Sequence, residues 1–334
     1  MEKINTGGKF SPSVRYDEPM SGHTTFKVGG KADVWVRPAK DIFPGYAAKL
    51  LKAAREEGIP VFILGAGANI VVSDNGIRGI VLDTGAFRGI GKREDMAPPK
   101  TPFPEAENPP VKDAPGEGEK AFFSVSVLSG TSVDGLVSRL AERGLSGLEF
   151  LAGMPGSVGG AVWMNARCYG KSVSDALVET EILDESFEKR KIPFRPEDFS
   201  YKKSPFQGRE NLILSARFAV HFGESADIRR ENTACRKDRS DKGHYRFPSA
   251  GSAFKNNHDF GDPSGRIIDQ AGFRGLSMGG AQIAPWHGNI IINTGSATAA
   301  DIRALMDEVA HRIKKERGFE LESEILFVGE WDKK

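Results

Sequence analysis

The sequence has little cysteine and no long apolar run. Its two cysteines, Cys168 and Cys235, are too few for a disulfide framework or a cysteine-based metal cluster, so we expect no metal site and a reducing compartment. No apolar run reaches the length that crosses a bilayer, and the first ten residues lack the apolar core of a secretory leader. We therefore expect a cytoplasmic protein without membrane contacts.

The sequence also lacks an excess of charge of either sign. Lys and Arg total 46 whereas Asp and Glu total 45, so composition gives no electrostatic sign of binding to nucleic acid or an anionic membrane. A length of 334 residues is sufficient for two or three domains with a sizeable core. We expect a globular protein in which any anion is held locally.

Glycine, by contrast, is concentrated in one stretch. Gly144–Gly170, GLSGLEFLAGMPGSVGGAVWMNARCYG, has seven glycines in 27 residues. Its glycines, a stiffening proline and a serine hydroxyl could direct successive N–H groups at a phosphate: Gly153, Pro155, Gly156, Ser157, Gly159 and Gly160. Tight turns that pack strands together explain the stretch alone equally well.

A second glycine loop follows the apolar segment Pro60–Leu64. It comprises Gly65, Ala66, Gly67, Ala68 and Asn69, and it suggests at first a Rossmann fingerprint. We reject that interpretation because the third glycine is missing and Ile70–Val72 is a β-branched segment that runs into a turn, not a helix. A strand, a glycine loop and a strand indicate a different phosphate cradle.

Periodicity and capping signals predict the remaining elements. Helices are expected at Asp41–Gly58, from a Thr131 and Asp134 cap to Arg143 before Gly144, at Ser225–Asp241, at Arg266–Ala271, and from a Thr298 and Asp301 cap to Gly318. Strands are expected at 32–36, where alternate residues are buried, at 60–64, 70–72, 121–128, 178–182, 212–220, 290–292 and 321–328. Lys92–Lys120 contains seven prolines and predicts an exposed inserted loop.

The Gly144–Gly170 stretch closely resembles the flavin-binding signature of the UDP-N-acetylenolpyruvoylglucosamine reductase family, the UDP-N-acetylmuramate dehydrogenases of peptidoglycan precursor synthesis. Further segments match family motifs in the same order: HTTFKVGG, LGAGANIVVSD, FSYKKSPF, PSAGSAFKNN and LESEI. The resemblance runs from about His23 to Gly329 and is interrupted by the proline-rich insertion. The PSAGS-type segment is similar to the family's second structural type.

The resemblance implies an α+β fold: a two-part FAD-binding domain of the vanillyl-alcohol-oxidase type, followed by an α+β substrate-binding domain. The expected boundaries are 1–85, 86–222 with a flexible insertion at 92–120, and 223–330. The implied reaction is the NADPH-dependent, FAD-mediated reduction of UDP-N-acetylglucosamine enolpyruvate to UDP-N-acetylmuramate. We expect a monomer.

The resemblance also assigns the cofactor residues to both glycine loops and one arginine. Ala68 stands where the family usually has serine, which removes one hydroxyl donor. The residues implied to bind FAD are Gly65, Ala66, Gly67, Ala68, Asn69, Gly153, Pro155, Gly156, Ser157, Gly159, Gly160 and Arg239.

Three residues take catalytic roles by resemblance. Ser252 is the implied proton donor, and Glu324 and Lys202 are candidates to stabilise the negative charge that develops on the substrate. The family has an arginine at the position of Lys202, and lysine keeps the charge but loses the planar fork that grips a carboxylate. Lys203 or Arg167 could supply the missing contact.

The implied substrate-binding residues are Tyr201, Lys242, Lys255, Asn256 and His287, and His287 is equally well explained as structural. Two other functions stay open. A flavin oxidase of the same fold would need a different substrate cap, and the PSAGS and LESE segments argue against it. A non-catalytic nucleotide-sugar or flavin-binding relative is compatible with lysine in place of the family arginine.

Overall fold

The computed structural model describes residues 11–97 and 121–332, and the chain divides into two compact units. The first unit joins the N-terminal segment up to Val14 with Val36–Ala66 and Leu82–Asp238. The second joins Arg15–Trp35, Gly67–Val81 and Arg239–Lys334. The domain boundaries expected at residues 85 and 222 stay a prediction.

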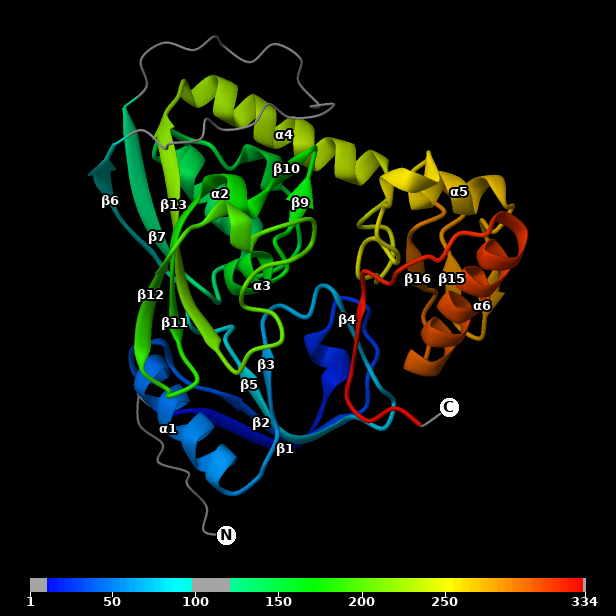
Figure 1. Ribbon diagram of the computed structural model, residues 1–334, viewed down its shortest axis with the longest axis horizontal. Coiled ribbons are helices and arrows are strands. Elements are labelled where there is room, and N and C mark those ends of the chain that lie inside the picture. Colours follow the sequence, from blue (N-terminus) through cyan, green and yellow to red (C-terminus); the bar gives the residue numbers. More distant parts are fainter. Residues whose placement is uncertain (1–10, 98–120, 333–334) are drawn as a thin grey trace. The chain divides into compact units, whose positions relative to one another are not determined.

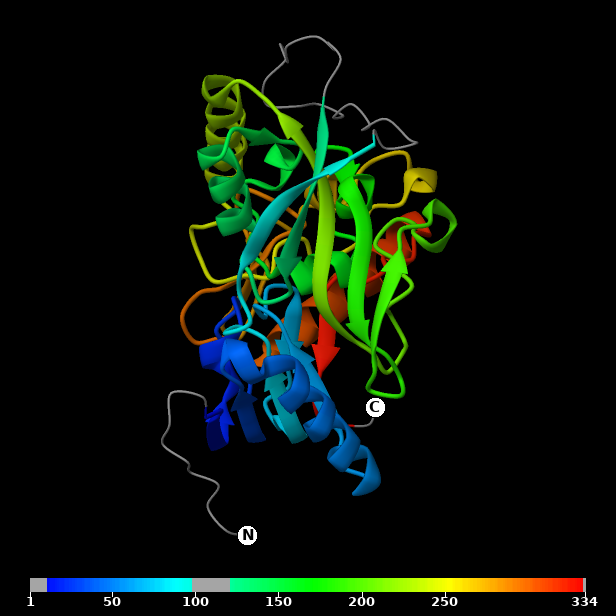
Figure 2. The ribbon, with the colours of Figure 1, turned by 90° about the vertical axis from the view of Figure 1, so that its left-hand side faces the viewer.

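The first unit is built on an antiparallel sheet with the order β12-β11-β13-β7-β6 (Figures 1 and 2). Strand β8 also pairs with β13. The strands are β6 (Ile90–Met96), β7 (Phe122–Leu128), β8 (Leu145–Ser146), β11 (Leu177–Leu183), β12 (Lys189–Pro193) and β13 (Leu212–Phe222). The long strand β13 pairs with three others and is therefore the centre of this sheet.

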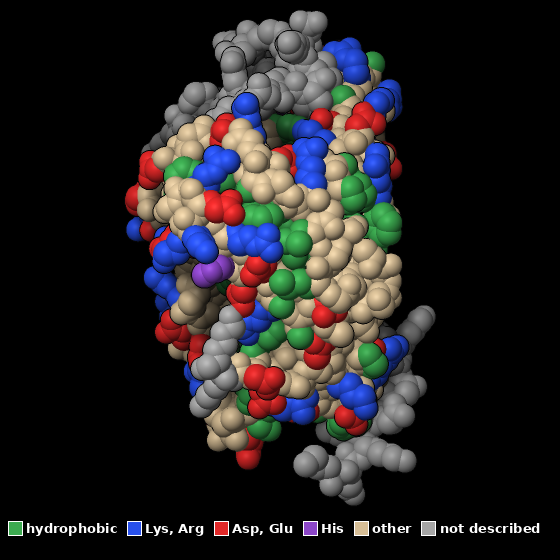
Figure 3. All heavy atoms as spheres, turned by 90° about the vertical axis from the view of Figure 1, so that its right-hand side faces the viewer, with side chains coloured by type: hydrophobic (Ala, Val, Ile, Leu, Met, Phe, Trp, Pro, Cys, Tyr) green, Lys and Arg blue, Asp and Glu red, His purple; other side chains and the backbone are tan. Residues whose placement is uncertain are grey.

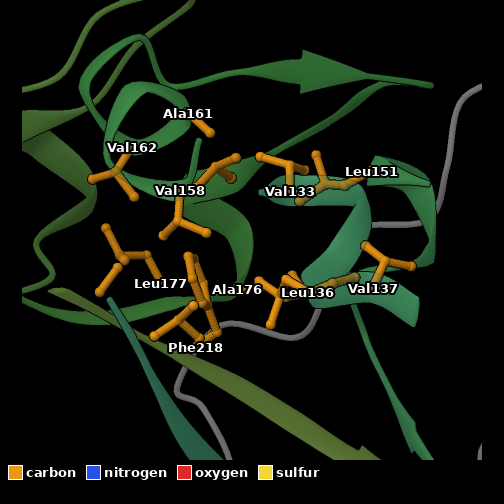
Figure 4. Close-up of a cluster of buried hydrophobic side chains, with 14 of the residues drawn as sticks. Val133, Leu136, Val137, Leu151, Val158, Ala161, Val162, Ala176, Leu177 and Phe218 are labelled. Atoms are coloured by element: carbon orange, nitrogen blue, oxygen red, sulfur yellow. The ribbon is translucent and has the colours of Figure 1, made fainter. Parts of the chain in front are cut away.

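Helices α2 (Val133–Glu142) and α3 (Val158–Trp163) pack against this sheet through an apolar cluster (Figure 4). Val133, Leu136 and Val137 of α2 meet side chains of α3 and the strands, each at most 8% exposed. Cys235 of α4 (Ser225–Asp241) belongs to the same cluster. Apolar burial thus fixes α3 and the glycine-rich segment that leads into it.

Helix α1 (Phe43–Glu56) buries its apolar side in a second cluster with Leu82, Phe87 and Leu183. It ends close to Gly58, whose positive φ of 67° suits glycine. The predicted helix over Asp41–Gly58 is confirmed with a shorter α-helical core. The pair β9 (Arg167–Cys168) and β10 (Lys171–Ser172) completes the strands of this unit.

A four-stranded sheet has the order β1-β2-β5-β3, and the division into units falls within three of its strands. The strands are β1 (Ser13–Pro19), β2 (Lys31–Arg37), β3 (Val61–Leu64) and β5 (Ile77–Asp83). The alternation expected for β2 is wrong at Trp35, because Trp35 and its neighbour Val36 are both buried. A tryptophan as large as this one is stabilised by burial on either face of a strand.

The second unit holds a three-stranded antiparallel sheet, two helices and a parallel strand pair. These are β14 (Ser277–Met278), β15 (Ala281–Ile283), β16 (Ile291–Asn293), α5 (Ser264–Gln270), α6 (Ala299–Arg317) and the pair β4 (Ile70–Val72) with β17 (Leu326–Val328). Short 3-10 helices occur at 20–23, 40–42, 149–151, 173–176, 196–198 and 258–260. The strand predicted at 321–328 is shorter than expected, because a continuous strand forms only at Leu326–Val328 and Ser323 makes a single bridge with Phe254.

Two further predictions need correction. The N-cap of α2 is Ser132, whose hydroxyl accepts the Gly135 N–H at 3.0 Å, and not Thr131. Asp134 is not part of that cap, because its carboxylate accepts the Gly153 N–H at 2.7 Å. Residues 92–96 of the predicted loop belong to β6, which pairs with β7, whereas 98–120 lie outside the described residues.

The capping box predicted for α6 is confirmed. The Thr298 hydroxyl accepts the Asp301 N–H, and the Asp301 carboxylate accepts the N–H groups of Thr298 at 3.0 Å and Gly280 at 3.1 Å. The buried face contains Ile302, Leu305, Met306, Val309 and Ile313, and Gly318 ends the helix with φ 75°. Asp301 therefore joins the helix start to the turn before β15.

We expect the substitution Asp301→Ala to lower the free energy of unfolding by about 1 kcal/mol at pH 7. The Thr298 N–H, with a further bond from Gly280, holds the pKa of Asp301 below its ordinary value of 3.8. A carboxyl whose folded pKa is lowered stabilises above its unfolded pKa, and that contribution disappears as pH falls through the folded value. Urea unfolding of both proteins at several pH values measures this, and the exposed helix substitution Glu316→Ala is the control. A difference that stays constant down to pH 2 would contradict the assignment.

Within the part of the chain that the structure describes, no helix has the length and apolar character needed to cross a membrane. The same residues contain no group of three or more His, Cys, Asp or Glu side chains arranged to hold a metal ion. On the face drawn in Figure 3, basic and acidic side chains are interspersed, in keeping with the balanced totals of 46 and 45.

Candidate functional site

The two glycine loops approach each other within the first unit. The first begins after β3 with Gly65 and Ala66, and the second leads through Ser157 into α3. A Cβ added to Gly65 would lie 2.4 Å from the Ser157 Oγ, which is far inside van der Waals contact. Only a residue without a side chain allows this approach, so the contact explains the glycine at position 65.

Hydrogen bonds to neighbouring elements hold the second loop in place. The Gly156 carbonyl accepts the Val133 N–H at 3.0 Å, and the Gly159 N–H donates to the Ser129 carbonyl at 2.8 Å. The Ser157 hydroxyl caps α3 by accepting the Gly160 N–H at 3.3 Å. Pro155, at the exposed turn, has no N–H to satisfy. The loop is thus rigid in its backbone.

In the part of these loops that belongs to the first unit, four N–H groups have no acceptor among the described residues. They belong to Gly65, Ala66, Gly156 and Ser157. Ser157 is 4% exposed, and buried N–H groups are nearly always bonded in folded proteins. N–H groups left over at two adjoining glycine loops have the donor chemistry that a diphosphate requires. The residues of the first unit therefore fit the diphosphate of FAD.

The rest of the first loop, Gly67–Asn69, lies in the second unit. Gly67 has φ 62°, and a Cβ there would lie 2.1 Å from the His23 carbonyl oxygen. Its carbonyl accepts the Thr25 N–H at 3.1 Å, so the HTTF segment supports the loop directly. Ala68 is half-buried and precedes Asn69, whose side-chain amide donates to the Glu324 carbonyl at 2.9 Å.

The second unit brings the segments of Ser252 and Glu324 together. The Glu324 N–H donates to the Ala253 carbonyl at 2.9 Å, and Phe254 forms a bridge with Ser323. Ser252 and Glu324 are both half-buried, whereas the intervening Ala253 is 0% exposed. Although these residues are about seventy positions apart in sequence, the backbones of their segments run side by side.

Asn289 holds the Ser252 segment from the other side, and sequence reasoning missed it. Its side chain accepts the Phe254 N–H and donates to the Phe254 carbonyl, both at 2.8 Å, while its own carbonyl accepts the Ala253 N–H. Asn289 is 4% exposed. The sequence signal that could have indicated this role is the segment GNIII, in which an asparagine precedes three isoleucines. A polar amide in such an apolar segment is buried, and a buried amide needs hydrogen-bond partners.

His287 has a structural environment. Its Nδ1 accepts the Asn289 N–H at 3.1 Å, which requires a ring nitrogen without a proton. Burial lowers the pKa of His287, so the imidazole is neutral at pH 7. A neutral ring keeps an Nε2 hydrogen that it could donate to a polar substrate. The structural role and the substrate-binding role of His287 are therefore both compatible with this environment.

Two of the predicted substrate-binding residues have polar partners within the second unit. The Lys255 ammonium pairs with Glu322, and the Asn256 side-chain oxygen accepts the Ser264 N–H at 3.0 Å at the start of α5. Glu322 is largely exposed whereas Glu324 is half-buried, so the two carboxylates of LESEI lie in different environments. The substrate roles of Lys255 and Asn256 stay predictions.

Lys202 and Tyr201 lie at the tip of a tight turn in the first unit. Ser200 and Lys203 exchange backbone hydrogen bonds around them, and Lys202 has φ 57°. The turn is tied to the end of α3, because Ser204 Oγ donates to the Trp163 carbonyl at 2.7 Å. Tyr201 is 39% exposed. The turn presents both side chains on rigid backbone, and Arg167 lies in β9 of the same unit.

Arg239 and Lys242 lie at the C-terminal end of α4. Arg239 is 8% exposed and its carbonyl accepts the His244 N–H at 3.0 Å, whereas Lys242 is exposed. The predicted catalytic residues divide between the units, with Lys202 in the first and Ser252 and Glu324 in the second. Their roles stay predictions.

Comparisons with known proteins agree with these features. A family model described as the C-terminal domain of UDP-N-acetylenolpyruvoylglucosamine reductase matches residues 243–328. The chain is similar to UDP-N-acetylenolpyruvoylglucosamine reductase of Treponema denticola, with 37% identity covering 96% of this chain and 94% of the relative. The reductase of Borreliella burgdorferi is 36% identical, with 93% of each chain covered.

A solved structure also matches over nearly the whole length. It is the UDP-N-acetylenolpyruvylglucosamine reductase of Thermus caldophilus, with a TM-score of 0.70 and 30% identity, covering 95% of this chain and 99% of that one. The expected α+β fold class is confirmed by this match and by the mixture of helices and sheets.

Proposed function

This chain belongs to the UDP-N-acetylenolpyruvoylglucosamine reductase family, and from that premise we propose that it reduces UDP-N-acetylglucosamine enolpyruvate to UDP-N-acetylmuramate. We propose FAD as its cofactor and NADPH as the electron source. The observation that carries the proposal is the pairing of the Ser252 segment with the Glu324 segment. This product is a precursor of peptidoglycan, so the reaction would serve cell-wall synthesis.

FAD, when bound, supplies the transfer of hydride from NADPH to the substrate. We propose that the N–H groups of both glycine loops hold its diphosphate, with Arg239 as a further contact. The N–H groups of Gly65, Ala66, Gly156 and Ser157, which find no acceptor among the described residues, support this assignment.

Ser252 is the proposed proton donor. Hydride addition to the terminal carbon of the enolpyruvyl double bond leaves negative charge on the carbon that bears the carboxylate, and a proton must reach that carbon. The Ser252 hydroxyl makes no hydrogen bond with any described residue, so it is available to a substrate. Serine is a weak acid in water, but an adjacent, strongly basic carbanion makes the transfer favourable.

Glu324 and Lys202 are proposed to stabilise the charge that develops on the substrate carboxylate. A carboxyl group stabilises added negative charge only when it carries a proton, so Glu324 would act as an acid in this step. Lys202 would act as a point charge without the two parallel bonds of an arginine. The polar groups of Tyr201, Lys242, Lys255, Asn256 and His287 are proposed to bind the nucleotide sugar.

The proposal is tested with the purified protein and added FAD under anaerobic conditions. We expect NADPH to bleach the flavin absorbance and the enolpyruvyl nucleotide sugar to restore it, with UDP-N-acetylmuramate formed in equal amount. Recovery of the flavin absorbance on adding oxygen, without the nucleotide sugar, would indicate a flavin oxidase instead. A protein that binds FAD yet shows no recovery with the nucleotide sugar would be a non-catalytic relative, and the proposal would be wrong.

A further inference from the structure

Asn69 contacts the strand segment of Glu324 twice. Its side-chain Nδ2 donates to the Glu324 carbonyl at 2.9 Å, and its own carbonyl accepts the Leu326 N–H at 3.0 Å. Both peptide groups beside Ile325 are therefore held by one residue. Asn69 is the last residue of the first glycine loop, so the loop and the Glu324 segment are joined directly.

The surroundings of this contact are rigid. Immediately after it, β4 and β17 pair in parallel, with Ile70 opposite Leu326 and Val71 opposite Phe327. Ile70 is 8% exposed and Ile325 is 2% exposed. On its other side, the Glu324 N–H donates to the Ala253 carbonyl at 2.9 Å. The Glu324 backbone is thus bonded to the glycine loop through one group and to the Ser252 segment through the other.

The contact requires a donor at position 69. A backbone carbonyl can only accept a hydrogen bond, and the amide of asparagine supplies an N–H donor. The asparagine side chain is short, so this donor stays close to the Glu324 carbonyl. Aspartate has the same shape but would present an acceptor to another acceptor. One of the two Nδ2 hydrogens is used on Glu324. We assign any contact of Asn69 with a diphosphate to its backbone N–H, which a substitution of the side chain leaves in place.

We propose that Asn69 is a positioning residue whose side chain fixes the Glu324 peptide, and with it the orientation of the Glu324 carboxyl relative to Ser252. This inference rests on the proposed function, because it requires Glu324 to act on the substrate. It gives Asn69 a role in the step that consumes the nucleotide sugar, in addition to its predicted place in the cofactor loop.

The test separates substrate reduction from cofactor binding. For Asn69→Ala we expect reoxidation of the flavin by the nucleotide sugar to slow about tenfold, the effect of one lost hydrogen bond. Bleaching by NADPH and the dissociation constant of FAD, followed by flavin fluorescence, are expected to stay near those of the unmodified protein. Asn69→Asp is a second, isosteric variant. We expect it to slow reoxidation more than Asn69→Ala does, because the carboxylate and the Glu324 carbonyl are then two acceptors that face each other.

A double-mutant cycle identifies Glu324 as the group through which Asn69 acts. In a Glu324→Gln protein, Asn69→Ala should cause little further loss, because coupled residues are not additive. The control is Asn75→Ala, which removes an exposed asparagine that donates to Asp332 at 3.2 Å in the same unit. Weaker FAD binding, equal loss of bleaching and reoxidation, or additive effects with Glu324→Gln would overturn the positioning role. An unmodified protein that the nucleotide sugar fails to reoxidise would overturn the proposed function itself.

Discussion

Replacing Ser252 by alanine is expected to slow reoxidation of the flavin by the nucleotide sugar by about 100- to 10,000-fold, the usual contribution of a general acid. Bleaching of the flavin by NADPH should continue at its normal rate, because no proton from Ser252 is needed to accept electrons from NADPH. Stopped-flow absorbance with the two substrates added in turn measures both rates.

A matched control distinguishes this effect from disturbance of the fold. Ser277→Ala removes the hydroxyl of an exposed serine in the same unit, which donates to the Gly275 carbonyl at 3.2 Å and accepts the Gln282 Nε2 hydrogen at 2.9 Å. This substitution should leave both rates unchanged. Equal loss of bleaching and reoxidation in Ser252→Ala would reject the proton-donor assignment.

Replacing Gly65 by alanine is expected to weaken FAD binding by about 10- to 100-fold. The new Cβ would lie 2.4 Å from the Ser157 Oγ, so the hydroxyl must rotate away and its bond to the Gly160 N–H is lost. Both glycine loops would then shift, and the spacing of their N–H groups would no longer fit one diphosphate. Fluorescence titration of the apoprotein with FAD measures the dissociation constant.

Two further variants test the steric explanation. Gly45→Ala, in the exposed part of α1, has no atom within 4 Å of the added Cβ and should bind FAD normally. Removing the clashing oxygen in Gly65→Ala/Ser157→Ala should recover part of the affinity, since the Ser157 Cβ would remain 3.6 Å away. Normal FAD binding by Gly65→Ala would show that the loop contact does not form part of the cofactor site.

Local signals in the sequence predicted many elements well. The α6 capping box of Thr298 with Asp301 and its buried face are as expected, because both depend on residues within one or two turns of each other. The cap of α2 was wrong by one residue, since Thr131 and Ser132 are equally suitable caps. Asp134 was misassigned because its partners, Gly153 and Arg236, are distant in sequence.

The candidate site was predicted by resemblance to motifs, and its supporting contacts were not predictable. Nothing near Asn69 in sequence indicates Glu324 as its partner, because the two are 255 positions apart. Asn289 was missed for the same reason, since its bonds to Phe254 cross 35 positions. Composition and spacing describe one segment at a time, whereas these contacts form only when strands pair.

By itself, the sequence determined that this protein has two glycine loops, a mixture of helices and strands, and segments of a known reductase family, because these follow from local geometry and residue type. Only the tertiary structure decided which polar groups meet. It joined Gly65 to Ser157, and it held Glu324 between Asn69 and the Ser252 segment. Burial of apolar strands brings such groups together, and each buried polar group then bonds to whichever partner the packing supplies.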